Sequence, residues 1–205
     1  MKIIAFNGSP HEKGTTSAGL SLVCEELGNA GVEVETLYVG GKAIHGCMGC
    51  GKCHRDGLCA IKDDGVNEYI EKTRLADGIV LASPVYYGGI AGGFKCLLDR
   101  MFFAGLNLLY KPAAALVVTR RSGAIAVYHQ LCNYLTLAGT VLTPTVYWNN
   151  IHGASAEETR QDGEGMYTMR CIGRNMAWLL NVLDAGKKIT PLPDLGPRVW
   201  TNFIH

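Results

Sequence analysis

The sequence predicts an α/β protein in which a doubly wound, five-stranded parallel sheet carries helices on both faces. Short apolar runs alternate with stretches of helical periodicity along the chain. Two of these runs, at residues 77–84 and 113–119, are apolar almost throughout, as expected of strands that are buried on both faces. No composition shift or linker divides the 205 residues, so we expect a single domain over residues 1–205.

The start of the chain predicts two strands separated by one helix. Residues 2–7 form an apolar run that ends at the turn signal Gly-Ser-Pro, and residues 16–30 repeat apolar side chains at helical spacing. Residues 31–39 alternate apolar and acidic side chains, which is the pattern of a half-buried strand. Residues 40–63 follow neither pattern, and we expect them to be a loop without regular structure.

The middle of the chain predicts a strand between two helices. The first helix covers residues 65–76, and either Asp63 or Asp64 can cap its amino end. The strand at residues 77–84 is expected to stop at its terminal proline. The second helix covers residues 91–104.

The last part of the chain predicts two more strands and two more helices. A strand at residues 113–119 leads into a helix over residues 126–139, and the fifth strand follows at residues 140–148. We expect residues 149–162 to form a polar loop and residues 163–186 to form the last helix.

Charge and hydropathy argue against several classes of protein. The net charge is +1 and no basic stripe is present, so nucleic-acid binding is not expected. No apolar run reaches the roughly 18 residues of a membrane span. The amino end does not have the pattern of a signal peptide, so we expect a cytosolic protein. Residues 187–205 contain three prolines and are expected to be an extended tail, able to wrap a neighbouring subunit.

Three loops at the carboxyl edge of the predicted sheet carry residues suited to a ligand, because open parallel sheets bind ligands at that edge. The first loop, residues 7–17, offers hydroxyl groups on Ser9, Thr15, Thr16 and Ser17. It opens a helix whose first N–H groups have no internal partners. It matches neither G-x-x-x-x-G-K-[ST] nor G-x-G-x-x-G. We therefore expect a site for a terminal monophosphate, with a plain helix cap as the alternative.

The second loop follows the strand at residues 77–84. Gly88 and Gly89 allow the backbone to lie against a flat ligand, on which Tyr86 or Tyr87 could stack. A simple turn that happens to contain two tyrosines is the alternative interpretation.

The third loop, residues 119–125, follows the fourth strand. Thr119 and Gly123 suit a close approach of the backbone to a ligand. Arg120 and Arg121 could meet a phosphate or an anionic ring, or they could be solvated surface charges.

Four clustered cysteines lie within residues 40–63. Cys47, Cys50, Cys53 and Cys59 follow the spacing C-x₂-C-x₂-C-x₅-C. Ferredoxin-type runs open with the same spacing around an iron–sulfur cluster. Zinc also binds four cysteines, although more often as two separated pairs. A thiol–disulfide couple between Cys50 and Cys53 would account for only two of the four.

Together these motifs resemble the flavodoxin-like, NADPH-dependent FMN reductase family, in the branch that includes the iron–sulfur flavoproteins. GSPHEKGTTS is similar to the family's phosphate loop, from which His11 and Thr15 depart. ADGIVLASPVYYGGIAGGFKCLLDR is similar to the family's S-P-V-Y motif and to the helix that ends in L-x-D-R. CMGCGKCHRDGLCAIKDD is similar to the cysteine stretch of that branch.

The resemblance implies a flavodoxin-like fold and one set of residues for each part of FMN. The phosphate loop would contribute Ser9, His11, Thr15, Thr16 and Ser17. The isoalloxazine ring would lie against Pro84, Val85, Tyr86, Tyr87, Gly88, Gly89, Thr119, Arg120, Arg121 and Gly123. Cys47, Cys50, Cys53 and Cys59 would hold a [4Fe-4S] cluster, or would form a cluster-free lid as in some relatives of the branch.

The resemblance also implies an activity. FMN would carry the redox chemistry without a catalytic side chain, taking electrons from NADPH or NADH and passing them to a small-molecule or protein acceptor. The alternatives are an electron carrier that relays between ferredoxin, the cluster and FMN, and a flavin-binding sensor without turnover. A homodimer or homotetramer is expected, in which residues 146–153 could close over the flavin.

Overall fold

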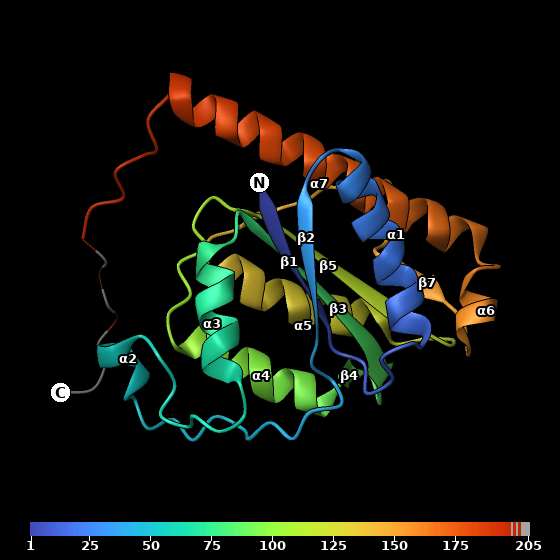
Figure 1. Cartoon of the computed structure of the whole chain (residues 1–205), viewed down its shortest axis with the longest axis horizontal. Coiled ribbons are helices and arrows are strands. Elements are labelled where there is room, and N and C mark those ends of the chain that lie inside the picture. Colours follow the sequence, from blue (N-terminus) through green and yellow to red (C-terminus); the bar gives the residue numbers. More distant parts are fainter. Residues whose placement is uncertain (198, 200, 202–205) are drawn as a thin grey trace.

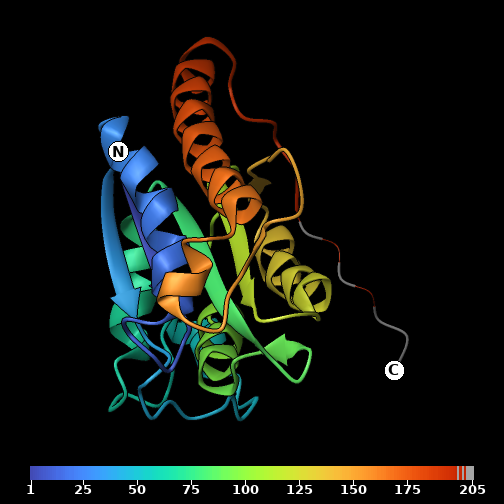
Figure 2. The same cartoon turned by 90° about the vertical axis from the view of Figure 1, so that its right-hand side faces the viewer.

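The computed structural model describes residues 1–197, 199 and 201, and it shows a central sheet between layers of helices (Figures 1 and 2). The strands are β1 (Lys2–Asn7), β2 (Glu33–Tyr38), β3 (Gly78–Tyr86), β4 (Gly89–Ile90), β5 (Pro112–Thr119), β6 (Val141–Leu142) and β7 (Asn150–His152). The helices are α1 (Thr15–Asn29), α2 (Cys53–Asp56), α3 (Val66–Leu75), α4 (Gly92–Phe103), α5 (Ala124–Leu137), α6 (Ala156–Thr159) and α7 (Gly163–Ile189).

The sheet has the strand order β2-β1-β3-β5-β6, and these neighbours pair in parallel. β7 also pairs in parallel with β5, whereas β4 pairs with β3 as an antiparallel hairpin. The order confirms the predicted doubly wound sheet. Because the chain moves outward from β1 to β2 and then back across to β3, the order reverses between β1 and β3, and a ligand is expected at that point.

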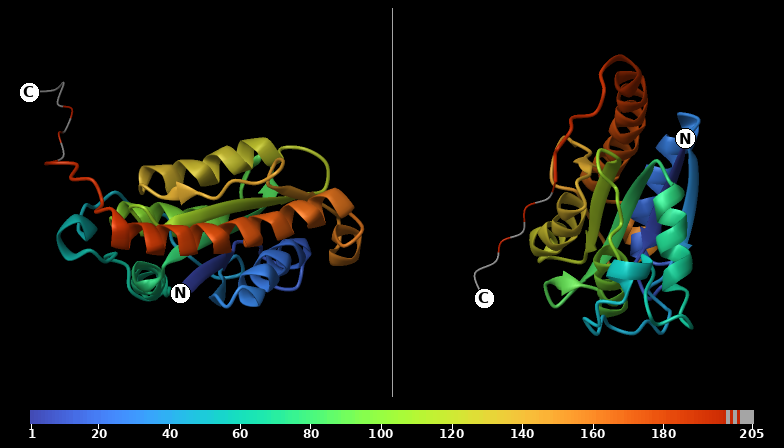
Figure 3. Two further views of the ribbon diagram at one scale, coloured as in Figure 1. Left: turned by 90° about the horizontal axis from the view of Figure 1, so that it is seen from above. Right: turned by 90° about the vertical axis from the view of Figure 1, so that its left-hand side faces the viewer.

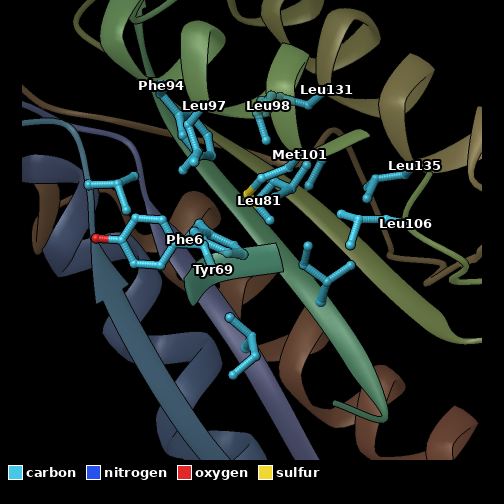
Figure 4. Close-up of a cluster of buried hydrophobic side chains, with 14 of the residues drawn as sticks. Phe6, Tyr69, Leu81, Phe94, Leu97, Leu98, Met101, Leu106, Leu131 and Leu135 are labelled. Carbon is cyan, nitrogen blue, oxygen red and sulfur yellow. The ribbon is translucent and has the colours of Figure 1, made fainter. Parts of the chain in front are cut away.

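Alternate side chains of the strands build two cores, one on each face of the sheet. Ile3 and Ala5 of β1 pack with apolar side chains of α1 and α7. Ile4 and Phe6 face the opposite way and pack with α3, α4 and α5. Figure 4 shows part of this second core, with Phe6 and Tyr69 near Leu97 of α4, and with leucines of α5 on the other side of the cluster. This two-sided burial explains the continuous apolar runs of β3 and β5.

The fifth strand was predicted at residues 140–148, and its position is confirmed but its length is wrong. The stretch instead contains the two-residue strand β6 and an irregular segment, and β7 begins only at Asn150. Asn149 fills the gap in the ladder, because its side-chain amide donates to the Ala115 carbonyl (3.0 Å) and its own carbonyl accepts from Val117 N–H (2.9 Å). The expected polar loop at residues 149–162 accordingly contains β7 and α6.

The strand at residues 77–84 does not stop at Pro84 as predicted. The ladder between β1 and β3 ends at Ala82, so the N–H group that a proline lacks at position 84 is not needed on that side. β3 therefore continues to Tyr86 and turns into β4.

Three other expectations need correction. The segment 40–63 is not wholly irregular, because it contains α2. The N-cap position of α3 is Gly65, in a left-handed conformation, rather than Asp63 or Asp64, although Asp64 Oδ1 accepts from the first N–H of the helix, that of Val66 (3.5 Å). α7 runs three residues into the predicted tail, and residues 190–197 after it are exposed and lead away from the helices (Figure 3). In the described part of the chain, no helix combines the length and apolarity needed to cross a bilayer.

Candidate functional site

The three predicted loops meet at the carboxyl edge of the sheet, which is the lower end of the molecule in Figure 2. Gly8 N–H donates to the Ala82 carbonyl (2.9 Å), which ties the first loop to β3. The second and third loops touch, because a Cβ atom at Gly123 would lie 3.4 Å from the Gly88 Cα. Gln130 of α5 links them further, since its Oε1 accepts from Ile90 N–H (3.3 Å).

The first loop leaves one buried hydroxyl without a partner. Ser9 is buried, and its Oγ accepts from His11 N–H (3.1 Å), so this hydroxyl already shapes the loop. α1 begins after Gly14 without a side-chain cap. In its first turn, Thr16 is fully buried and its Oγ1 makes no hydrogen bond. Such an orphan costs desolvation energy, which a ligand oxygen would recover.

The close packing of the first loop requires glycine at two positions. A Cβ atom at Gly8 would lie 2.2 Å from the Phe94 side chain, and one at Gly40 would lie 2.1 Å from the Ser9 carbonyl oxygen. The loop is thus seated between α4 and the start of the cysteine segment. Thr15 and Ser17 are half-buried, whereas His11 is exposed on the outside of the loop.

The second loop is a two-residue hairpin turn with a strained residue. Tyr87 has φ +49° and Gly88 has φ +72°, the left-handed conformations of a type I′ turn. This is rare for a tyrosine. Its side chain is fully exposed, and Tyr86 beside it is 43% exposed. Pro84 and Val85 lie half-buried just behind the turn.

The third loop is closed by its own side chain. Thr119 is buried and its Oγ1 donates to the Ser122 carbonyl (2.8 Å). Gly123 has φ +86°, which favours glycine, and it is the N-cap of α5. Arg120 and Arg121 are exposed.

A histidine–aspartate pair that no local sequence pattern indicates lies next to the third loop. β7 ends beside Thr119, and its His152 donates from N–H to Asp162 Oδ2 (2.7 Å), with Nδ1 at 3.3 Å from the same oxygen. Burial raises the pKa of Asp162, but backbone donors and His152 outweigh it and lower the pKa below its usual value. Of the segment 146–153, only its carboxyl end reaches this edge, since β7 runs parallel to β5.

The cysteine segment leaves from the same edge, but its cysteines lie elsewhere. The chain runs from β2 along α4 to α2 at the opposite end of that helix (Figure 1). There Cys53 Sγ donates to the carbonyl of Phe103, the last residue of α4 (3.6 Å). Gly93 lies in the first turn of α4 and Phe103 is its last residue. At 1.5 Å per residue, these two residues are about 15 Å apart along the helix.

All four clustered cysteines line one small cavity of about 20 Å³, together with Arg100 and Phe103. Cys47 and Cys50 are exposed, Cys59 is half-buried and Cys53 is buried. Within the described residues, no group of three cysteine, histidine or acidic side chains is arranged to hold a single metal ion. A broader surface hollow of about 950 Å³ opens beside the cavity, between α2 and the carboxyl ends of α4 and α5.

Arg100 of α4 is the main residue of this region that was not predicted from the sequence. Its side chain is fully buried and pairs with Asp64 through both terminal guanidinium nitrogens. Its Nε donates to Cys59 Sγ (3.2 Å). Burial raises the pKa of Asp64, but Arg100 overcomes this and lowers it below its usual value. An arginine between the buried positions Leu98 and Met101 of an apolar helix was the signal available in the sequence.

Comparisons with known proteins agree with this architecture. An iron-sulfur flavoprotein from Methanocaldococcus jannaschii is 30% identical over 192 residues, covering 89% of this chain and 99% of its own. The crystal structure of RosB with bound 8-demethyl-8-formylriboflavin-5'-phosphate superposes with a TM-score of 0.69 at 18% identity, over 99% of this chain and 92% of RosB. A flavodoxin from the domain Archaea superposes with a TM-score of 0.59 at 13% identity, over 88% and 99% of the two chains.

These structural likenesses establish a flavodoxin-like fold. The family model for the NADPH-dependent FMN reductases matches residues 1–154. The chain therefore belongs to the NADPH-dependent FMN reductase family of FMN-binding oxidoreductases.

Proposed function

We propose that this protein is an FMN-dependent oxidoreductase that transfers electrons from NADPH or NADH to a second acceptor. The observation that carries the proposal is the buried, unpartnered hydroxyl of Thr16 in the loop where this family would place the FMN phosphate. A phosphate oxygen at the first turn of α1 would give this hydroxyl a partner.

The residues at the sheet edge fit FMN in both chemistry and placement. The uncapped start of α1 has free N–H groups for a phosphate, joined by hydroxyls of Ser9, Thr15, Thr16 and Ser17. The ring would lie against residues 84–89 and 119–123, which touch each other at Gly88 and Gly123. When bound, FMN supplies hydride acceptance and electron transfer.

The protein's own part is to bind and orient. The turn at Tyr87 and Gly88 exposes an aromatic face on which a flat ring can stack. Arg120 and Arg121 offer positive charge beside the ring site, and His11 lies at the outer rim of the phosphate loop. None of these side chains is required to move a proton.

The cavity lined by four cysteines favours a second candidate, an iron–sulfur flavoprotein that relays electrons between ferredoxin, a [4Fe-4S] cluster and FMN. The donor set fits, since four thiolates ligate such a cluster. A cavity of about 20 Å³ has room for roughly one water molecule, so binding requires the rim to open. Cys47 and Cys50 are on that rim and are exposed. The adjacent hollow would give a protein partner access.

A homodimer or homotetramer is also part of the proposal. The exposed aromatic side chains of Tyr147, Trp148 and Trp178 support it, since large exposed apolar surfaces often mark subunit contacts. Light scattering of the purified protein measures the assembly directly.

Stopped-flow mixing of the FMN-loaded protein with NADPH or NADH tests the main proposal. An oxidoreductase bleaches the flavin absorbance rapidly and then turns over with a quinone or free FMN. Reduction by ferredoxin but not by either nicotinamide would select the electron carrier. A flavin-loaded protein that shows no turnover with NADPH, NADH or ferredoxin would instead be a sensor, and the proposal would be wrong.

A further inference from the structure

We propose that Arg100 is a positioning residue that fixes Cys59 and raises the reduction potential of the iron–sulfur cluster; this rests on the cluster named under the proposed function. The guanidinium bonds to four residues of the chain between β2 and α3 at once. Besides Asp64 and Cys59, it donates to the carbonyls of His45 (3.3 Å) and Ile61 (3.1 Å). One buried side chain thus fastens the segment on both sides of the cysteine cavity.

The charge balance of the pair explains why an arginine can be buried here. A lone buried cation is strongly disfavoured, and Asp64, whose side chain is 7% exposed, neutralises it. The planar guanidinium forms a fork, so two nitrogens pair with Asp64 while Nε remains free for the Cys59 sulfur. A lysine would present a single ammonium and could not make this set of contacts.

The hydrogen bond from Arg100 Nε to Cys59 Sγ affects the redox equilibrium, because reduction of the cluster would make the sulfur more negative. A one-electron reduction adds one negative charge to the cluster and its thiolates, with no bond formed or broken. A donor on a cation binds a more negative sulfur more tightly, and burial strengthens this difference. Hydrogen bonds to cysteine sulfurs are among the known determinants of cluster potential. Arg100 should therefore stabilise the reduced state.

The test is a potentiometric titration of the anaerobically prepared holoprotein with dithionite, followed by electron paramagnetic resonance. We expect Arg100→Gln to lower the equilibrium constant for reduction about tenfold, which is about 59 mV for one electron. Lys95→Gln is the matched control, because it removes a positive charge from the same helix at an exposed position that does not contact a cysteine. The FMN potential in the same titration is an internal reference and should stay unchanged in Arg100→Gln.

A second pair of variants covers the case in which Arg100→Gln leaves Asp64 unpaired and the segment fails to fold. Asp64→Asn removes the negative partner and should raise the potential or leave it unchanged. The equilibrium constant for cluster reduction in the double variant Asp64→Asn with Arg100→Gln should be about tenfold lower than in Asp64→Asn alone. Iron lost from both Arg100 variants, with FMN retained and Asp64→Asn still loaded, would support the anchoring of Cys59.

Equal potentials in loaded wild-type protein and loaded Arg100 variants would overturn this inference and leave the proposed function intact. A wild-type protein that binds no iron and no labile sulfide would overturn it together with the electron-carrier candidate. Flavin bleaching by NADPH or NADH is independent of both results, so the two failures are distinguishable.

Discussion

At the scale of single residues, we expect removal of the Thr16 hydroxyl to have opposite effects on the stability of the protein and on FMN binding. It is buried without a partner, so Thr16→Val should raise the stability of the FMN-free protein by about 1 kcal/mol. If the hydroxyl donates to the phosphate, the same change should weaken FMN binding by roughly tenfold or more. Thermal unfolding of the FMN-free protein and a fluorescence titration with FMN measure the two effects.

Thr143 provides a matched control for that experiment. It is also buried with an unpartnered hydroxyl, but its N–H bonds to Ala113 at the amino end of β5, far from the loops. Thr143→Val should raise stability by a similar amount without changing FMN affinity. Unchanged affinity in Thr16→Val as well would argue against a phosphate at this position.

The sequence indicated the chemistry of individual residues better than their environment. Hydroxyl-bearing and glycine residues in the first loop were evident, since their types and spacing are local. The Ser9 hydroxyl has a hydrogen-bond partner within the loop, whereas the Thr16 hydroxyl has none. This difference depends on the folded loop and is not visible in the sequence. The role of Arg100 could not be read locally, because Asp64 and Cys59 lie 36 and 41 residues away in sequence.

At the scale of elements, α1 and α7 are joined by a cluster of ion pairs, in which Glu26 lies between two arginines and Glu25 also pairs with Arg170. Glu26 of α1 accepts from Arg174 Nε (2.8 Å) and Arg170 Nη1 (2.9 Å) of α7. These arginines lower the pKa of Glu26 below its usual value. The stabilisation is therefore complete above the unfolded-state pKa of about 4.3 and is lost as the pH falls through the folded-state value.

Glu26→Gln should destabilise the protein by about 1 kcal/mol at pH 7, a modest effect because both arginines are partly exposed. The difference from wild type should shrink as the pH falls below about 4. Urea unfolding at several pH values measures it. Glu33→Gln, which breaks an exposed pair with Lys2, should change stability by less than about 0.5 kcal/mol. An equal loss in both variants would contradict the assignment.

Elements with a strong, uniform pattern were predicted well, and those fixed by tertiary pairing were not. β3 and β5 are buried on both faces, so their apolar runs showed them directly. The apolar stretch at residues 140–148 looked similar, but only the short strand β6 forms within it, and β7 begins after Asn149, whose side chain bonds to β5. The β3–β4 hairpin depends on positive φ at Tyr87, which no local preference of tyrosine predicts.

At the scale of the whole molecule, the two candidate cofactor sites occupy opposite ends of α4. Cys53→Ser should abolish iron binding and leave FMN bound, because the flavin loops lie about 15 Å away along the helix. Serine can keep the hydrogen bond to the Phe103 carbonyl, so the fold should persist. Iron, labile sulfide and FMN per chain in anaerobic preparations measure the result.

Cys132→Ser on α5 is the control for that experiment, because Cys132 does not line the cavity. This variant should leave the iron content and the FMN content unchanged. Loss of FMN together with iron in Cys53→Ser would contradict independent sites. Iron that persists in Cys53→Ser would show that this cysteine is not a ligand.

The anchoring of the cysteine segment by Arg100 also has a consequence for the order of folding. His45, Cys59, Ile61 and Asp64 all attach to a residue on a helix that follows them by 36–55 positions. These contacts cannot form until α4, which carries Arg100, is in place. We expect amide protons of this segment to become protected from exchange only after those of α4. If the four cysteines bind a cluster, a newly made chain would acquire its metal only after α4 has folded.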